Sequence, residues 1–70
     1  MAERRLGNRL KEIRTARNLT QADLADLAGV SRKTINTVEN GVFVPSTTLA
    51  LALAQTLSVR VEDLFYLTDG

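Results

Sequence analysis

The sequence contains neither cysteine nor histidine. The chain therefore has no disulfides, no thiolate nucleophile, no imidazole base and none of the common zinc ligand sets. Its few carboxylates are scattered along the 70 residues and suggest no acid and base pair. We expect a protein that is not an enzyme and that uses neither a metal nor a cofactor.

Long apolar runs are also lacking. No stretch approaches the roughly 20 residues that span a bilayer, and the segment MAERRLGNRLKEIR lacks the apolar core of a secretion signal. We expect a soluble, cytoplasmic protein with no membrane partner. A chain of this length allows one domain, residues 1–70, which buries only about 60% of its unfolded surface.

The net charge of +1 hides an asymmetry along the chain. Residues 1–41 carry eight basic and five acidic side chains, a net charge of +3, whereas residues 42–70 carry Arg60 against three acidic side chains. This distribution points the first part toward a polyanion such as nucleic acid. A basic solvated face is the commoner explanation of a single charge cluster.

Apolar spacing predicts five short helices and no strand. Leu6, Leu10 and Ile13 recur at i, i+4 and i+7, so we expect an amphipathic helix over about residues 3–17 that ends near Asn18.

Three hydroxyl residues mark the starts of further helices. Thr20, Ser31 and Ser46 are natural N-caps for the segments QADLADLA, RKTINTVE and TTLALALAQTL. A last short helix, VEDLF, places its two carboxylates in the first turn, where the helix dipole favours them. Helices four and five therefore fall within residues 46–66.

The most informative unit is the pair of short helices within residues 21–40. Their junction, LAGVS, is too short for an antiparallel hairpin of long helices, and Gly29 supplies the positive φ of a sharp turn. Ala25 lies where the two helices would touch, and a small side chain lets their backbones approach. These features favour a helix-turn-helix over a generic helix pair in a small bundle.

This region resembles a known family. The stretch LTQADLADLAGVSRKTINTVENG resembles the helix-turn-helix core of Cro and the lambdoid phage repressors, the XRE family, and PSTTLALALAQTLSVRVEDLF is similar to the last two helices of its short members. The resemblance implies an all-α, five-helix, lambda-repressor-like domain that binds DNA and is usually dimeric. Two positions depart from the family: Ser58 stands where it commonly has glycine, and Arg60 where it often has a serine-like cap.

The resemblance also implies which residues contact the major groove of double-stranded DNA. Base-reading positions of the family correspond to Arg32, Lys33, Asn36 and Thr37, and phosphate-binding positions to Gln21, Ser31 and Asn40.

The charges of the third helix are reversed with respect to its dipole. Arg32 and Lys33 lie in the first turn and Glu39 in the last, although the dipole favours anions in the first turn and cations in the last. Contacts with bases and phosphates explain the cations, because one good base contact is worth about 1 to 3 kcal/mol. Glu39 needs a different partner, and Arg14, at the border of the stripe of the first helix, is placed to pair with it.

The end of the chain suggests an interface. Phe65, Tyr66 and Leu67 form a consecutive apolar run, and Leu51 lies off the main stripe of the fourth helix. One interpretation is that Phe65 and Leu67 close the core; the alternative is that all four residues form a two-fold homodimer contact.

Two classes of function remain. The leading hypothesis is a sequence-specific transcriptional regulator, most simply a repressor that binds an inverted-repeat operator as a dimer. The alternative is a protein-interaction module, such as an antitoxin or adaptor, that engages a small protein partner and binds DNA secondarily.

Overall fold

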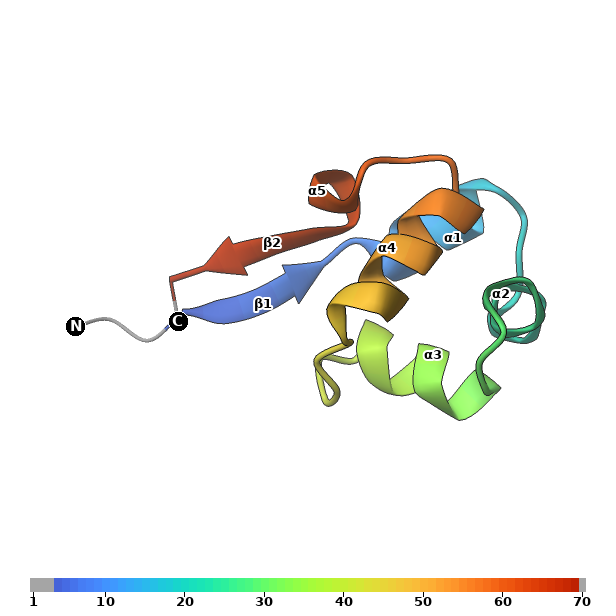
Figure 1. The fold of residues 1–70 in the computed structure, drawn as a ribbon, viewed down its shortest axis with the longest axis horizontal. Coiled ribbons are helices and arrows are strands. Elements are labelled where there is room, and N and C mark those ends of the chain that lie inside the picture. Colours follow the sequence, from blue (N-terminus) through green and yellow to red (C-terminus); the bar gives the residue numbers. More distant parts are fainter. Residues whose placement is uncertain (1–3, 70) are drawn as a thin grey trace.

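The computed structural model describes residues 4–69 and contains five helices and two short strands (Figure 1). In chain order these are β1 (Arg5–Asn8), α1 (Leu10–Ala16), α2 (Gln21–Ala28), α3 (Arg32–Glu39), α4 (Thr47–Thr56), α5 (Val61–Leu64) and β2 (Phe65–Thr68). Within the described residues, none of these helices has both the length and the apolarity needed to cross a membrane.

The starts of three helices follow the predicted caps. The side-chain oxygens of Thr20, Ser31 and Ser46 each accept the backbone N–H three residues later, which satisfies one free donor at each helix start. At α2 the Asp23 carboxylate accepts the N–H of Thr20 in return, at 2.9 Å. These local bonds fix where the chain turns into each helix.

The core joins all five helices. The buried apolar side chains come from every helix or its C-cap, and they are Leu10, Leu24, Ala25, Ile35, Val38, Leu53, Ala54, Leu57 and Leu64. Burying one large apolar side chain is worth about 1.5 to 3 kcal/mol. We call residues 10–64 the helical body, because this core holds them together.

The two departures from the family have a visible local structure. Ser58 adopts a left-handed conformation with φ of 56°, which explains why glycine suits this position. Arg60 is the N-cap of α5 but makes no capping bond with its side chain. Its backbone N–H is instead accepted by the Asp63 carboxylate at 3.0 Å, so α5 begins without a hydroxyl cap.

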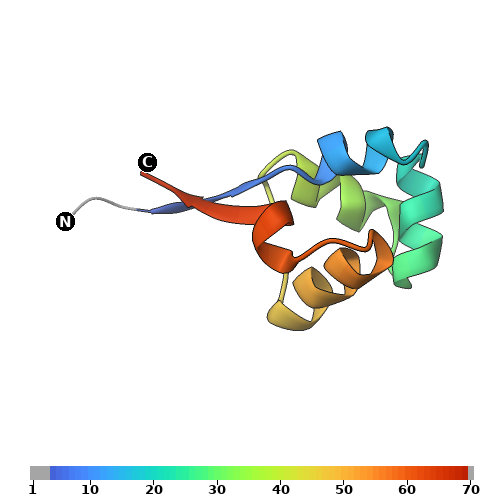
Figure 2. The same ribbon diagram turned by 90° about the horizontal axis from the view of Figure 1, so that it is seen from above.

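The five expected helices are confirmed, but the expectation that no strand accompanies them was wrong. β1 and β2 pair antiparallel, with Arg5 opposite Thr68 and Asn8 opposite Phe65. They form a two-stranded ribbon that projects from the helical body (Figures 1 and 2). We call residues 5–8 and 65–68 the ribbon.

Pairing of the two strands also shortens α1 and α5, the helices that adjoin the ribbon in the sequence. Leu6 lies in β1, so α1 begins at Leu10 and not near residue 3, which lies outside the described residues. The N–H of Arg9 donates to the carbonyl of Leu64 at 2.8 Å, so backbone groups that a longer first helix would use bond instead to a distant segment. Phe65 already has extended backbone angles, so α5 ends at Leu64 and not at Phe65.

One face of the ribbon is closed by an aromatic ring. Gly7 lies opposite Tyr66, and a Cβ atom at position 7 would come within 2.5 Å of the ring. The guanidinium carbon of Arg9 lies 4.6 Å from the ring centroid, a cation–π distance. The glycine therefore leaves room for the Tyr66 ring, which also meets the Arg9 cation.

Candidate nucleic-acid interface

The turn between α2 and α3 has the expected geometry. Gly29 takes a left-handed conformation with φ of 73°, and the N–H of Val30 donates to the carbonyl of Ala25 at 3.0 Å. Ala25 is buried where the two helices approach. The sharp turn and the small side chain together let α3 cross α2 at close range.

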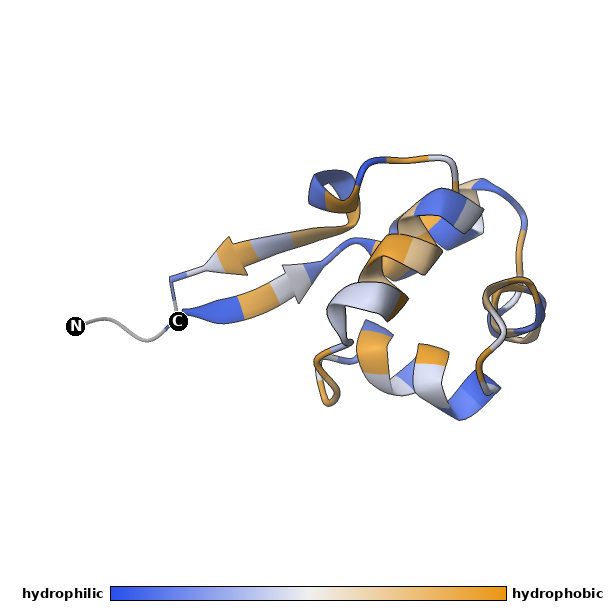
Figure 3. Ribbon diagram, viewed as in Figure 1, coloured by the Kyte–Doolittle hydropathy of each residue, from blue (hydrophilic) through white to orange (hydrophobic). Residues whose placement is uncertain are grey.

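The two faces of α3 differ in polarity. Ile35 and Val38 are buried in the core. The opposite face holds the residues assigned to DNA contacts: Ser31, Arg32, Lys33, Asn36 and Asn40 are exposed, and Thr37 is half-buried. Figure 3 shows the hydrophilic N-terminal end of α3 and the bands of opposite hydropathy along it. The polar face is therefore free to meet a partner.

A buried ion pair joins α1 to α3. The Nε and Nη2 atoms of Arg14 donate to the Glu39 carboxylate at 2.7 and 3.2 Å, and the two side chains are 9% and 3% exposed. The hydrogen bond to Glu39 raises the pKa of Arg14, against the opposing effect of burial. Arg14 also donates to the carbonyl of Leu19 at 2.8 Å. One guanidinium thus ties α1, the loop before α2 and the end of α3 together.

Gln21 adds a third element to this network. It is the first residue of α2, and its Nε2 donates to Oε1 of Glu39 at 3.1 Å. The backbone N–H of Gln21 lies among the free donors of the helix start, which suit a phosphate. The amide therefore fixes the start of α2 against the end of α3.

Several polar groups on the outer face are already engaged within α3. The Thr37 hydroxyl donates to the carbonyls of Lys33 and Thr34, each at 3.0 Å. Asn40 Nδ2 donates to Asn36 Oδ1 at 3.3 Å. Only part of each of these side chains is left for a base.

Sequence reasoning missed two contributors to this region. Asn8, at the base of the ribbon, donates through Nδ2 to the carbonyl of Val38 at 3.0 Å and accepts the N–H of Leu10 at 3.1 Å. The bond from Gln21 to Glu39 was the other. A polar residue two positions before an apolar helix start was the only available signal for Asn8, because its partner lies 30 residues away.

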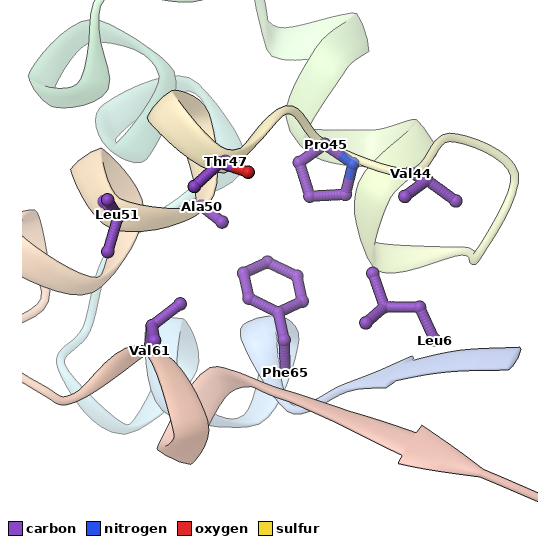
Figure 4. A pocket seen from close by; sticks show the side chains of 8 residues that line it. All are labelled: Leu6, Val44, Pro45, Thr47, Ala50, Leu51, Val61 and Phe65. Carbon is purple, nitrogen blue, oxygen red and sulfur yellow. The ribbon is translucent and has the colours of Figure 1, made fainter.

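A separate apolar face lies between the ribbon and α4. It encloses a hollow of about 300 Å³ (Figure 4), lined by Leu6, Val44, Pro45, Thr47, Ala50, Leu51, Val61 and Phe65. Leu51 is 54% exposed and Leu67 is 62% exposed. Tyr66 points to the other side of the ribbon, over Gly7, because neighbouring residues of a strand face opposite sides. The structure thus brings Leu51 and Phe65 together on one face and separates Tyr66 from them.

The described residues contain no group of three or more acidic side chains placed to hold a metal ion.

Comparison with known sequences assigns the helical body to a family. The profile of the helix-turn-helix family HTH_3 matches residues 10–64 and leaves the ribbon outside. A relative from Methanocaldococcus jannaschii, named an uncharacterized HTH-type transcriptional regulator MJ0272, is 47% identical over 62 residues, covering 89% of this chain and 94% of the relative. The HTH-type regulator YgzD of Bacillus subtilis is 37% identical over the same shares.

Solved structures agree with this assignment. The restriction-modification controller protein C.AhdI from Aeromonas hydrophila superposes with a TM-score of 0.76 at 38% identity, covering 79% of this chain and 83% of that one. An HTH_3 family transcriptional regulator from Vibrio cholerae gives a TM-score of 0.72 at 27% identity, covering 79% of this chain and 31% of that one. This chain therefore belongs to the helix-turn-helix family HTH_3, as its resemblance to XRE proteins predicted.

Proposed function

We propose that this protein is a sequence-specific transcriptional regulator that binds double-stranded DNA in the cytoplasm and has no enzymatic activity. The observation that carries the proposal is the outer face of α3, where cations and amides are exposed and the one carboxylate is withdrawn into an ion pair with Arg14. Membership of the helix-turn-helix family and the regulator names of its relatives support it.

In this mechanism the N-terminal half of α3 enters the major groove. Arg32 and Lys33 meet guanine acceptors and phosphates, which outweighs their unfavourable position at the helix start. Gln21 and the start of α2 hold a phosphate and set the angle of approach. Glu39 does not repel the DNA, because Arg14 neutralises it.

The apolar face beside the ribbon supports a homodimer. We propose that a second copy covers Leu51, Phe65 and Leu67. The side chains of Leu51 and Leu67 are more than half exposed. Tyr66 lies outside this contact, since its ring packs on Gly7 on the other side. A two-fold dimer would place two α3 helices roughly 34 Å apart on an inverted repeat, and occupying a promoter in this way would repress it.

The first test selects bound duplexes from a random pool. In the selected site, Lys33→Ala and Thr37→Ala should each weaken binding by about 1 to 3 kcal/mol more than they weaken binding to random DNA. Gln21→Ala is the matched control, because a phosphate contact should weaken binding to all duplexes alike. Equal ratios of specific to nonspecific affinity in all three variants would contradict the assignment of roles.

The second test concerns assembly. Leu51→Glu should shift the mass measured by sedimentation from that of a dimer toward that of a monomer. It should also lower the affinity for the full inverted repeat, while leaving binding to a half-site. Leu27→Glu changes a similarly exposed leucine on α2, away from the apolar face, and should leave the mass unchanged. A Leu51→Glu protein that stays dimeric would exclude this interface.

The hollow in the same face also favours the second candidate, a protein-interaction module such as an antitoxin or adaptor. A wild-type protein that is monomeric at all concentrations and selects no DNA motif would point to a small protein partner on this face.

A further inference from the structure

The recognition surface of α3 lacks a free carboxylate. Oε2 of Glu39 accepts from Arg14 at 2.7 Å, and Oε1 accepts from Arg14 at 3.2 Å and from Gln21 at 3.1 Å. Glu39 is the only acidic residue in α3, and its side chain is 3% exposed. An acidic side chain is the usual acceptor for the amino group of cytosine, so this mode of reading is unavailable.

The amide of Asn36 is also restricted. An asparagine reads adenine by accepting from N6 and donating to N7 at the same time. Here Oδ1 of Asn36 already accepts from Asn40 at 3.3 Å, so the two-bond pairing with adenine would have to share or break that bond. Donation through Nδ2 to guanine N7 or O6 needs no such change, so Asn36 favours guanine.

Thr37 is restricted in a different way. Its hydroxyl donates to the carbonyls of Lys33 and Thr34, which turns the oxygen toward the helix backbone. The methyl group is the part of the side chain left for a base contact. An apolar group in the major groove recognises the C5-methyl of thymine.

The remaining groups at the N-terminal end of α3 are donors or are occupied. Arg32 and Lys33 have no acceptor atoms. Ser31 Oγ accepts the N–H of Thr34 as the helix cap. The oxygen of Asn40 lies at the C-terminal end of α3, away from the end that such motifs point at the bases.

We infer that α3 reads guanine through hydrogen-bond donors and thymine through a methyl contact, in preference to the amino groups of adenine or cytosine. Lys33 and Asn36 supply the donors for guanine, and Thr37 supplies the methyl for thymine. This inference rests on the proposed DNA-binding function and specifies the base edges that the same surface recognises.

The test uses base analogues in the half-site obtained by selection. Each thymine is replaced in turn by deoxyuridine, which lacks only the methyl group, and each guanine by 7-deazaguanine, which lacks the N7 acceptor. One thymine per half-site should lose about fourfold in affinity, the value of one buried methyl group. One guanine should lose about tenfold, as expected for a lost hydrogen bond to a charged donor.

Two variants assign the thymine contact to Thr37. Thr37→Ser removes the methyl and keeps the hydroxyl, so it should abolish the sensitivity to deoxyuridine. Thr37→Val keeps a methyl and removes the hydroxyl, so it should retain that sensitivity. Thermal unfolding of both variants is measured first, and the comparison uses the ratio of affinities for the two duplexes, which is independent of the folded fraction.

The outcomes separate this inference from the function on which it rests. A selected motif whose affinity is unchanged by both analogues, or equal deoxyuridine sensitivity in Thr37→Ser and wild type, would overturn the inference and leave DNA recognition standing. Failure to enrich any sequence would overturn both.

Discussion

The helical body and the ribbon obtain their structure from contacts of different range. In the body, Thr20, Ser31 and Ser46 each fix a helix start through a bond that spans three residues. In the ribbon, Arg5 and Thr68 pair although they are 63 residues apart. Local sequence therefore fixes where these helices of the body begin, whereas the ribbon depends on the body to bring its two strands together.

The two regions also differ in packing and in family. The body encloses a continuous apolar core, and the family profile spans it completely. The ribbon has no fully buried residue and lies outside that profile. We therefore expect changes in the body to affect folding and DNA binding together, and changes in the ribbon to be local.

The largest expected effect comes from breaking the ion pair inside the body. Arg14→Met leaves the buried Glu39 carboxylate with Gln21 as its remaining side-chain donor, and should lower the free energy of unfolding by about 3 to 5 kcal/mol. Urea unfolding followed by circular dichroism, at one protein concentration, measures it.

The control for this prediction removes both charges. Arg14→Met with Glu39→Gln should be more stable than Arg14→Met alone, because no uncompensated charge stays buried. Equal unfolding midpoints for the single and double variants would count against a penalty from the unpaired carboxylate.

The next effect tests whether the ribbon is separable from the body. Gly7→Ala places a Cβ atom against the Tyr66 ring and should displace it, at a cost of about 1 kcal/mol. In hydrogen exchange, the amides of residues 5–8 and 65–68 should lose protection while those of α2 and α3 keep it.

A second substitution checks the cause. In a Tyr66→Ala background, Gly7→Ala should cost little more, since the ring it displaces is gone. Loss of protection throughout α2 and α3 in Gly7→Ala would show that ribbon and body unfold as one unit.

A smaller effect concerns a strained turn within the body. Ser58→Gly should raise the free energy of unfolding by about 0.5 kcal/mol, because glycine adopts a positive φ without the steric cost that serine has there. Asn18→Gly is the matched control, since Asn18 has a similar φ of 59° but asparagine tolerates it better. A gain at position 18 that equals or exceeds the gain at 58 would refute this explanation; thermal unfolding is the measurement.

The smallest effect is the pH dependence of one helix cap. Hydrogen bonding by the backbone N–H of Thr20, and then by its side chain, lowers the pKa of Asp23. Because the folded pKa lies below the unfolded one, this stabilisation is present above about pH 4 and is lost as the pH falls through the lowered pKa. Wild type should therefore melt slightly higher than Asp23→Asn at pH 7, and the gap should narrow as the pH falls below about 4. A gap that stays constant from pH 7 down to pH 2 would rule out the titration as its source.

The comparison of body and ribbon also explains what the sequence predicted. The caps, the turn at Gly29 and the order of the five helices depend on neighbouring residues, and the structure has them all. The strands were missed because Leu6 fits the helical stripe of Leu10 and Ile13, so the same residues satisfy two periodicities. Only the alternative partner, β2, decides between them.

The same distinction applies to the site. The exposed positions of α3 follow from helical periodicity, so their placement was accessible from the sequence. The hydrogen bonds that restrict them were not, since Gln21 meets Glu39 only after the steep crossing of α2 and α3. The bond from Asn40 to Asn36 spans one turn, but spacing alone does not show which amide atom it occupies.

The distance between the paired strands has a consequence during synthesis. β1 is synthesised before β2, and Thr68 follows Arg5 by 63 residues, which takes roughly 3 to 13 s at about 5 to 20 residues per second. Until then Leu6 and the backbone of β1 have no partner strand, although by the end of that interval the residues of α1 to α4 have all been synthesised. A released chain that ends before Phe65 should therefore present β1 as an open strand edge next to the helices.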